Sequence, residues 1–482
     1  MKTSAKLLSI VVVLGVAYAG GSWYMGKRAQ TVIEHAVDQT NQRLVKVLGP
    51  DLGGSGLKVS VAQYKRGLFS SDVVYALTMN DNDGKPLDFK LADHLQHGPF
   101  PIAALRAGSF APMLAYSHAQ LIPTAATQKW FDSTKGEAPV VAVTTIDFSG
   151  RGDSQWELKP LAHADNGNSI NFSGGKIHIV FSQDYKDSTA SGRFDSIEFA
   201  QAAPHEEVKV KGIAFDSKTT TPADGVTHIE NRFNANSVAF SSDSGESVQI
   251  QKLAIGLDTQ QKDQLFDAKL HYELGQVSAA KADLGSMSFT GSASHFNVDA
   301  VNALANQYNA FKAAHGVKDD ADLQLTDAES AVLREKFMEV LASNPSVSVD
   351  SLVWKNDKGE STASLKVDLS SPADKTAANK AGLDTLLPQV LKQIALNFSI
   401  SKPMLAGLVS QLQGGAQANP QADAVGAMLF DAYAGKLQSV GLAKVDGDKA
   451  VAAIKYENNS VDVNGTKMSV MEFAQRAMAV AM

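Results

Sequence analysis

The chain contains no cysteine. A protein without cysteine has no disulfide bonds, no thiolate zinc or iron-sulfur site and no cysteine nucleophile. The absence does not indicate a compartment, because cysteine-poor proteins occur in both reducing and oxidising spaces. It excludes only the chemistry that depends on a thiol.

A concentrated basic segment is also missing. The 44 Lys and Arg residues stand against 51 Asp and Glu residues, which gives a formal net charge of -7. Proteins that bind nucleic acid gather Lys and Arg on one face to neutralise phosphates. We therefore expect no nucleic-acid partner.

Motifs for phosphate binding, metal binding and nucleophilic catalysis are absent from the sequence. It contains no Walker loop, dinucleotide fingerprint or HExxH pattern. Residues 53–56 include a serine, but Leu57 stands where a nucleophile elbow needs glycine. The segment 80–84 resembles a calcium loop, yet Met79 and Lys90 occupy positions that need carboxylates. We expect a non-catalytic protein without a cofactor.

His94 and His97 are three residues apart, a spacing at which two imidazoles on a helix share one face and bind a metal ion. Gly98 and Pro99 follow at once, and the sequence indicates no third ligand. We therefore favour a structural role and expect no metal site.

Three residues are candidates for ligand binding, with a structural role as the favoured alternative. His97 opens a segment in which Pro99 and Pro101 restrict two φ angles, so we expect a rigid loop with Phe100 pointing inward. Arg66 precedes Gly67, which suits a bend between two strands. The candidates are His97, Phe100 and Arg66, although joining strands rigidly requires the same residue types.

The N-terminus carries the strongest local signal. Lys2 and Lys6 precede a run from Leu7 to Met25 without a charged residue. As a helix this run measures about 28 Å, close to the thickness of a bilayer's hydrocarbon core. Residues 1–26 therefore predict a signal anchor or a signal peptide. We favour a retained anchor, because the apolar character continues past the small-x-small pattern that ends at Ala19.

The remainder of the chain is expected to be an exported, water-soluble body, because no second run of eighteen apolar residues exists. Residues 27–50 predict a juxtamembrane helix, since their apolar positions recur at helical spacing. Residues 51–300 predict a β-rich part, in which short runs of alternating apolar and polar residues form a long antiparallel meander with one wet face. The fold class is α+β.

Residues 301–482 predict a mixed α+β part. Thr326 and Glu329 form a capping-box pattern, which opens a helix that ends before Asn344-Pro345. A hairpin is expected from Val347–Trp354 and Ser361–Leu369, and Ser371-Pro372 suits the start of a helix. Further predicted helices are 301–314, 383–396, 403–412, 422–438 and one from Met471, with a flexible loop at 414–421 and strands at 450–456 and 461–463.

Several clusters occur in a shared order along the whole chain. They are Gly20–Tyr24 with Gly26-Lys27, Tyr64–Ser71, His97–Pro101, Lys135–Glu137, Leu158–Leu161, Phe172–Gly175, Gln307–Ala310, Trp354–Asn356 and Asn464-Gly465 with Lys467–Ser469. In these clusters the chain resembles the YdgA-like family of Gram-negative bacterial envelope proteins, whose biochemical function is unknown. The resemblance implies a single-pass protein of the bacterial inner membrane with its body in the periplasm. It implies no catalytic residues.

These observations lead to a functional expectation with alternatives. We expect a binding or scaffold protein of the cell envelope, held to membrane lipid by its N-terminal anchor and interacting with an envelope protein or an apolar ligand such as a lipid. The lipid interpretation rests on analogy, because alternating strands can line a groove with apolar side chains. One alternative is an envelope hydrolase with a cleft between the β-rich and helical parts. Another is a homo-oligomeric structural protein.

Overall fold

The computed structural model describes residues 18, 21–22, 24–31, 33–34, 37–38, 41, 57–81, 84–280, 282–317, 323–374, 383–414 and 420–481. The chain forms two compact units. Unit 1 comprises Met1–Ala200 and Ile213–Thr220, and unit 2 comprises Gln201–Gly212 and Thr221–Met482. The expected change of character at residue 300 falls inside unit 2, where a strand is followed by a long helix.

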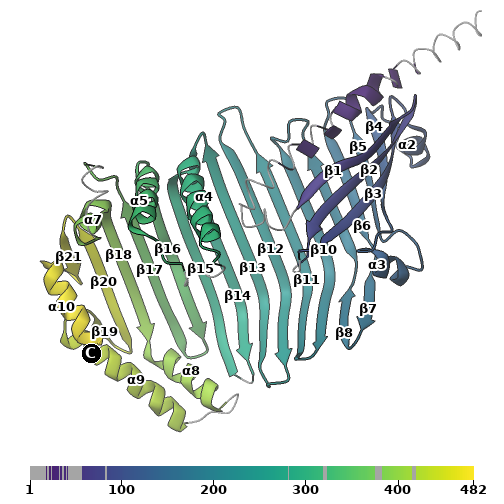
Figure 1. Cartoon of the computed structure of the whole chain (residues 1–482). Helices are drawn as coiled ribbons and strands as arrows, with labels where there is room; N and C mark the ends of the chain where they lie inside the picture. Colours follow the sequence, from purple (N-terminus) through teal and green to yellow (C-terminus); the bar gives the residue numbers. More distant parts are fainter. Residues whose placement is uncertain are drawn as a thin grey trace, which may run out of the picture. The chain divides into compact units, whose positions relative to one another are not determined.

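Unit 1 is an antiparallel meander with short helices in its loops (Figure 1). Strands β1 to β6, β9 and β10 are successive hydrogen-bonded neighbours, and β8 pairs with β7 and β10. Its elements are β1 Lys58–Arg66, β2 Ser70–Asn80, β3 Pro86–His97, α2 Ile102–Arg106, β4 Ala115–Ile122, α3 Gln128–Ser133, β5 Val140–Ile146, β6 Gly152–Leu158, β7 Leu161–Asp165, β8 Asn168–Phe172, β9 Gly175–Phe181, most of β10 Ser188–Ala202 and the second half of β11 His205–Thr220.

The N-terminal helix packs on the sheet of unit 1. The described residues between Tyr18 and Asn41 are helical, so the helical spacing read in residues 27–50 is present up to Asn41, and its place next to a membrane stays a prediction. Ala29 of this helix is fully buried against Leu95 on β3 and Ile146 at the end of β5. Because the helix covers this part of the sheet, one face of β3 and β4 becomes a core.

Unit 2 is a second meander, in which β12 to β18 pair in sequence and β20, β21 and β22 continue the order (Figure 1). β19 also pairs with β20. The strands are β12 Thr227–Ser242, β13 Ser247–Lys262, β14 Leu265–Ala279, β15 Ala282–Asn297, β16 Ser346–Asn356, β17 Gly359–Leu369, β18 Leu391–Ser401, β19 Lys444–Asp446, β20 Lys449–Glu457, β21 Ser460–Val463 and β22 Thr466–Ser469. The helices are α4 Val298–Ala314, α5 Asp327–Leu341, α7 Leu383–Val390, α8 Lys402–Gly414, α9 Pro420–Ser439 and α10 Val470–Ala481.

Local sequence signals account for several of these elements. The predicted capping box at the start of α5 is present, because the Thr326 hydroxyl accepts from the Glu329 amide and the Glu329 carboxylate accepts from the Thr326 amide. The predicted hairpin of β16 and β17 is closed by Asn356, whose Oδ1 accepts from the amides of Lys358 and Gly359. Predicted helices at α4, α8 and α9 are confirmed as well.

Other expectations were wrong or incomplete. The predicted helix 383–396 ends at Val390, and residues from Leu391 onward form β18. The physical reason is that β18 pairs along its length with β17 and β20, which supplies backbone hydrogen bonds on both edges. Residues 371–374 are not helical, and 375–382 lie outside the described residues, as do 415–419 of the predicted loop. The strand β22 and the short helices α2 and α3 were not predicted.

In the part of the chain that the structure describes, no helix is long and apolar enough to cross a membrane. Most of the apolar run from Leu7 to Met25 lies outside the described residues. The predicted anchor therefore stays a prediction.

Candidate ligand-binding site

The sheet of unit 2 has one apolar face. Residues directly opposite one another on neighbouring strands share a face of the sheet. The register of β12 to β20 places eight such residues in one continuous line, which we call the apolar row. Its members are Phe233, Ile255, Tyr272, Phe289, Leu352, Ala363, Phe398 and Ala452.

The opposite face of the same strands is polar. A line of facing residues there consists of Glu230, Asp258, Lys269, Ser292, Ser348, Lys366, Ala395, Lys455, Asp462 and Lys467. Ala395 is its one apolar member. The Lys366–Asp368 and Lys455–Glu457 ion pairs lie on this side. The predicted polar, solvent-exposed face of the meander is therefore present in unit 2.

Helices cover the apolar face at the C-terminal end of unit 2. Ile400 and Ala450 pack against Phe430 of α9 and Leu405 of α8. Val461, Val463 and Met468 pack against α10 in the same way (their partners include Phe473, Ala477 and Val480). At this end the apolar face therefore forms an ordinary buried core.

The other end of the apolar row is not buried. Ala452 is 5% exposed, whereas Tyr272 is 38% exposed, and Ile255 and Phe289 on either side of it are half-buried. The rings of Tyr272 and Phe289 are 6.3 Å apart at an angle of 53°, so this surface is aromatic as well as aliphatic. A sheet face with this composition and without a covering layer is suited to an apolar ligand.

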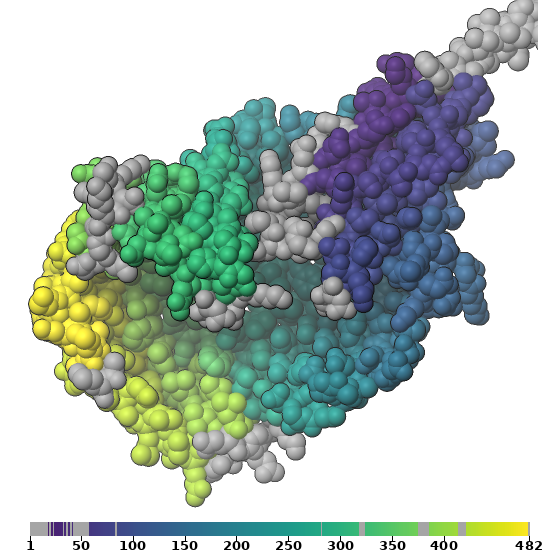
Figure 2. All heavy atoms as spheres, in the orientation of Figure 1, coloured from purple at the N-terminus to yellow at the C-terminus, as the bar shows by residue number. Residues whose placement is uncertain are grey.

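The helices flank the uncovered part of the apolar face. In Figure 1, α4 and α5 lie across one end of the strands of unit 2, and α8 and α9 lie across the opposite end. The connectivity explains this arrangement, because α4 follows β15 and α8 follows β18, and these two strands run in opposite directions. Figure 2 shows the surface hollowed between the two helix pairs. We call this region of unit 2, floored by the apolar row, the apolar groove.

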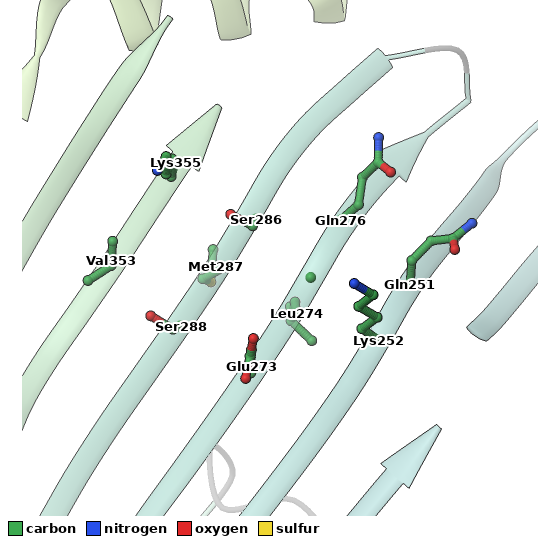
Figure 3. A pocket seen from close by; sticks show the side chains of 11 residues that line it. Gln251, Lys252, Glu273, Leu274, Gln276, Ser286, Met287, Ser288, Val353 and Lys355 are labelled. Carbon is green, nitrogen blue, oxygen red and sulfur yellow. The ribbon is translucent and has the colours of Figure 1, made fainter. Parts of the chain in front are cut away.

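Depressions on the polar face are a different kind of feature. One of about 520 Å³ is lined by Lys252, Glu273, Ser288 and neighbouring residues. In Figure 3, Glu273 and Ser288 stand on the near side of the strands, whereas Leu274 and Met287 lie on the far side. A second, of about 740 Å³, is lined mainly by serine, lysine and aspartate. Both are open to solvent and lack the apolar walls that enclose most small-molecule ligands.

The residues predicted as candidates lie in unit 1. His97 is 1% exposed at the end of β3, and its Nε2 is 2.9 Å from the Ser71 hydroxyl. Burial lowers the pKa of His97, and the positive charge of Arg66 lowers it further. Arg66 is exposed at the end of β1. These groups lie near one another, but His97 has no access to solvent.

The expected inward orientation of Phe100 was wrong, because its side chain is 42% exposed. Pro101 is the fully buried residue of this loop and directly precedes α2. Since Pro101 fills the interior, Phe100 lies outside it. His94 and His97 belong to a strand and not to a helix, and their odd separation places them on opposite faces of the sheet.

A second buried polar group lies on the same face as His97. Ser117 donates to Asp93 at 2.7 Å, and the Tyr75 hydroxyl donates to the other carboxylate oxygen at 3.4 Å. Burial raises the pKa of Asp93 and of Tyr75. The Ser71–His97 pair lies apart from this carboxylate, so the described contacts do not form a Ser-His-Asp triad. Asp93 and His97 lie on the same face of β3 as Leu95, which packs against the N-terminal helix.

Metal ligands are not gathered at any point of the described ranges, where no group of three or more His, Asp or Glu residues is arranged to hold an ion.

Sequence analysis did not single out the apolar row as a site. The alternating runs indicated which residues share a face along each strand. They did not indicate which strands would remain without a covering helix, because that depends on how the connecting helices return to the sheet.

These features define a class of protein, namely a β-meander protein with an apolar sheet face that is partly covered by helices. The chain belongs to a bacterial protein family of unknown function, DUF945, whose family model matches residues 1–471. This finding confirms the resemblance to the YdgA-like family.

Curated relatives are similar over nearly the whole chain. Protein YdgA of Escherichia coli is 26% identical over 98% of this chain and 96% of its own length. The uncharacterized protein YihF of the same organism is 24% identical over 97% of each chain. An uncharacterized protein of Haemophilus influenzae is 24% identical over 43% of this chain and 56% of its own length. No solved structure matches.

Proposed function

We propose that the protein is an inner-membrane-anchored, periplasmic binding protein of the cell envelope and that its apolar groove binds an apolar ligand, such as the acyl chains of a lipid. It acts without catalysis. The observation that carries the proposal is the apolar row, whose residues in β12 to β16 are not buried although their neighbours in β20 are.

The chemistry of the apolar groove favours an acyl chain. Each methylene group moved from water onto an apolar surface contributes about 0.8 kcal/mol. The apolar row contains three direct cross-strand neighbours, Ile255, Tyr272 and Phe289. Together they form a continuous apolar surface that runs perpendicular to the strands. A flexible chain lying along this line contacts several strands at once and needs no polar partner from the protein.

The uncharged run from Leu7 to Met25 supports the membrane part of the proposal. A protein that is held at a bilayer by such a run has a source of lipid at its point of attachment. The resemblance to the YdgA-like family supports the same placement in the inner membrane and periplasm.

Binding of a dansyl-labelled fatty acid to the purified full chain tests the groove. The variant Tyr272→Asp places a charge at an exposed position of the apolar row and should weaken binding at least tenfold, about 1.4 kcal/mol. Phe289→Asp is the second variant. The matched control is Thr290→Asp, which adds the same charge to the neighbouring position of β15 on the polar face, opposite His271.

Equal binding by the Tyr272→Asp and Thr290→Asp proteins, with both folded by far-ultraviolet circular dichroism, would contradict the proposal. Native mass spectrometry of the detergent-extracted chain identifies the natural occupant. Bound lipid supports the proposal, and a bound envelope protein without lipid contradicts the assignment of the groove to lipid.

A further inference from the structure

Large apolar side chains are exposed at one end of unit 1. They belong to two loops that lie side by side, because the amide of His97 donates to the carbonyl of Phe69 at 2.8 Å. The first loop joins β1 to β2, and the second runs from β3 through α2 to β4. The exposed residues are Leu68, Phe69, Phe100, Ile102 and Phe110, which we call the loop patch.

The first described residues of the N-terminal helix lie at the loop patch. The ring of Tyr18 stacks on Phe69 with centroids 5.8 Å apart, and its hydroxyl donates to the carbonyl of Phe100 at 3.0 Å. Four residues later, the buried Ser22 hydroxyl donates to the carbonyl of Gly98 at 2.6 Å. In Figure 1, α2 and this helix lie at the same end of unit 1. The loop patch therefore lies at Tyr18, the residue that follows the apolar run Leu7–Ala17 in the sequence.

The residues that form the loop patch and the described start of the N-terminal helix carry no acidic side chain. Residues 18–33, 66–71 and 94–115 contain no Asp or Glu and include Lys27, Arg28, Arg66 and Arg106. Two exposed carboxylates lie at the same end of the strands, Asp72 near the start of β2 and Asp147 after the end of β5. Lys27, Arg66 and Arg106 are exposed. An apolar patch whose basic neighbours outnumber the acidic ones is complementary to the interface of an anionic bilayer, where aromatic rings sit at headgroup depth.

We propose that the loop patch inserts into the surface of the membrane in which the N-terminal run is anchored, so that unit 1 is held to the bilayer at two places. The occupant is the anionic headgroup and upper acyl region of the lipid. This inference rests on the proposed anchor and is independent of ligand binding in the apolar groove.

The absence of cysteine allows a direct test with single-cysteine variants. Ile102→Cys and Phe110→Cys place a probe at side chains that are 59% and 74% exposed, so neither change removes a core residue. Ala125→Cys is the control, because it is exposed in the loop after β4, at the opposite end of the strands of unit 1. Each full-length variant is labelled with an NBD fluorophore and reconstituted into vesicles of phosphatidylethanolamine and phosphatidylglycerol.

We expect the emission of probes at positions 102 and 110 to shift to the blue and to be quenched by lipids brominated near the headgroup. The emission of the probe at position 125 should neither shift nor be quenched. Quenching should weaken when phosphatidylcholine replaces phosphatidylglycerol. If the protein floats with the vesicles while the probes at positions 102 and 110 stay unquenched, the inserted loop patch is wrong and the proposed anchor stands. Failure of the chain to float would overturn the anchor and the inference together. If the emission shifts only in native membranes and is not quenched, the loop patch binds a protein partner, and its assignment to lipid is wrong.

Discussion

At the scale of single residues, the contact between the N-terminal helix and β3 depends on a glycine. A Cβ atom at Gly26 would lie 2.3 Å from the His97 ring. The ring is buried and hydrogen-bonded to Ser71, so it cannot move away without losing that bond. The helix therefore approaches the sheet as closely as it does because residue 26 has no side chain.

Gly26→Ala should lower the free energy of unfolding of unit 1 by about 1–3 kcal/mol through overpacking. Gly21→Ala is the matched control in the same helix, because nothing lies within 4 Å of its added Cβ. There the better helix propensity of alanine should leave stability unchanged or raise it by up to about 1 kcal/mol. Urea denaturation of the detergent-solubilised chain measures both, and equal effects of the two changes would contradict the docked position of the helix.

The buried imidazole of His97 predicts a pH dependence. Burial lowers the pKa of His97 in the folded state, whereas the unfolded side chain titrates near pH 6.5. As pH falls below about 6.5 the unfolded chain takes up a proton that the folded chain does not, so stability should fall. His97→Gln, whose amide can still reach Ser71, should remove this component of the slope in urea denaturation between pH 7 and 5. His94→Gln, at an exposed position, should retain it. An unchanged slope in the His97→Gln protein would contradict the assignment.

At the scale of elements, α5 depends on its N-terminal cap. Thr326 and Glu329 satisfy each other's backbone amides, and hydrogen bonds from the Thr326 amide and from His315 lower the pKa of Glu329 to about 2. Met338 and Leu341 of this helix pack against Leu386 and Val390 of α7. The cap therefore stabilises a helix that flanks the apolar groove.

Thr326→Ala should lower the free energy of unfolding by about 1 kcal/mol, because the Glu329 amide loses its acceptor. It should also return the pKa of Glu329 toward its ordinary value, since the threonine hydroxyl donates to that carboxylate. Thr326→Ser retains the hydroxyl and should behave like the natural chain. Hydrogen exchange in the first turn of α5 measures the effect, and equal protection in the alanine and serine proteins would argue against it.

Elements with a strong local signal were predicted, whereas those stabilised by distant partners were not. The capping box of α5 and the turn of β16 and β17 require only residues within four positions of one another. Residues 391–396 also show helical apolar spacing, but pairing with β17 and β20 makes them a strand. The orientation of Phe100 likewise depended on the tertiary structure, which buries its neighbour Pro101 and leaves Phe100 exposed.

At the scale of the whole molecule, the contacts of the N-terminal helix predict that the anchor is retained. Tyr18 and Ser22 lie on either side of the predicted cleavage point after Ala19, and both bind the loop between β3 and β4. Cleavage would remove Tyr18 with its hydrogen bond and its stacking on Phe69.

We therefore expect the chain extracted from membranes to have its full mass of 51.1 kDa. Intact-protein mass spectrometry measures this directly. A Phe69→Ala protein is the control for the role of stacking, since it should expose the segment and increase any processed fraction. A natural chain that begins at Gly20 would contradict the retained anchor and assign the segment to a signal peptide.

The sequence by itself determined the apolar N-terminal run, the family and the alternation that makes one face of each strand apolar, because these are properties of neighbouring residues. Only the tertiary structure decided which part of that face is buried. The register between strands aligns Phe233, Tyr272 and Phe398 into one row, and the return of α8, α9 and α10 covers the row at β20 but not at β14. The physical reason is that burial results from contacts between segments far apart in the chain, and alternation within a strand is the same whether or not a helix lies above it.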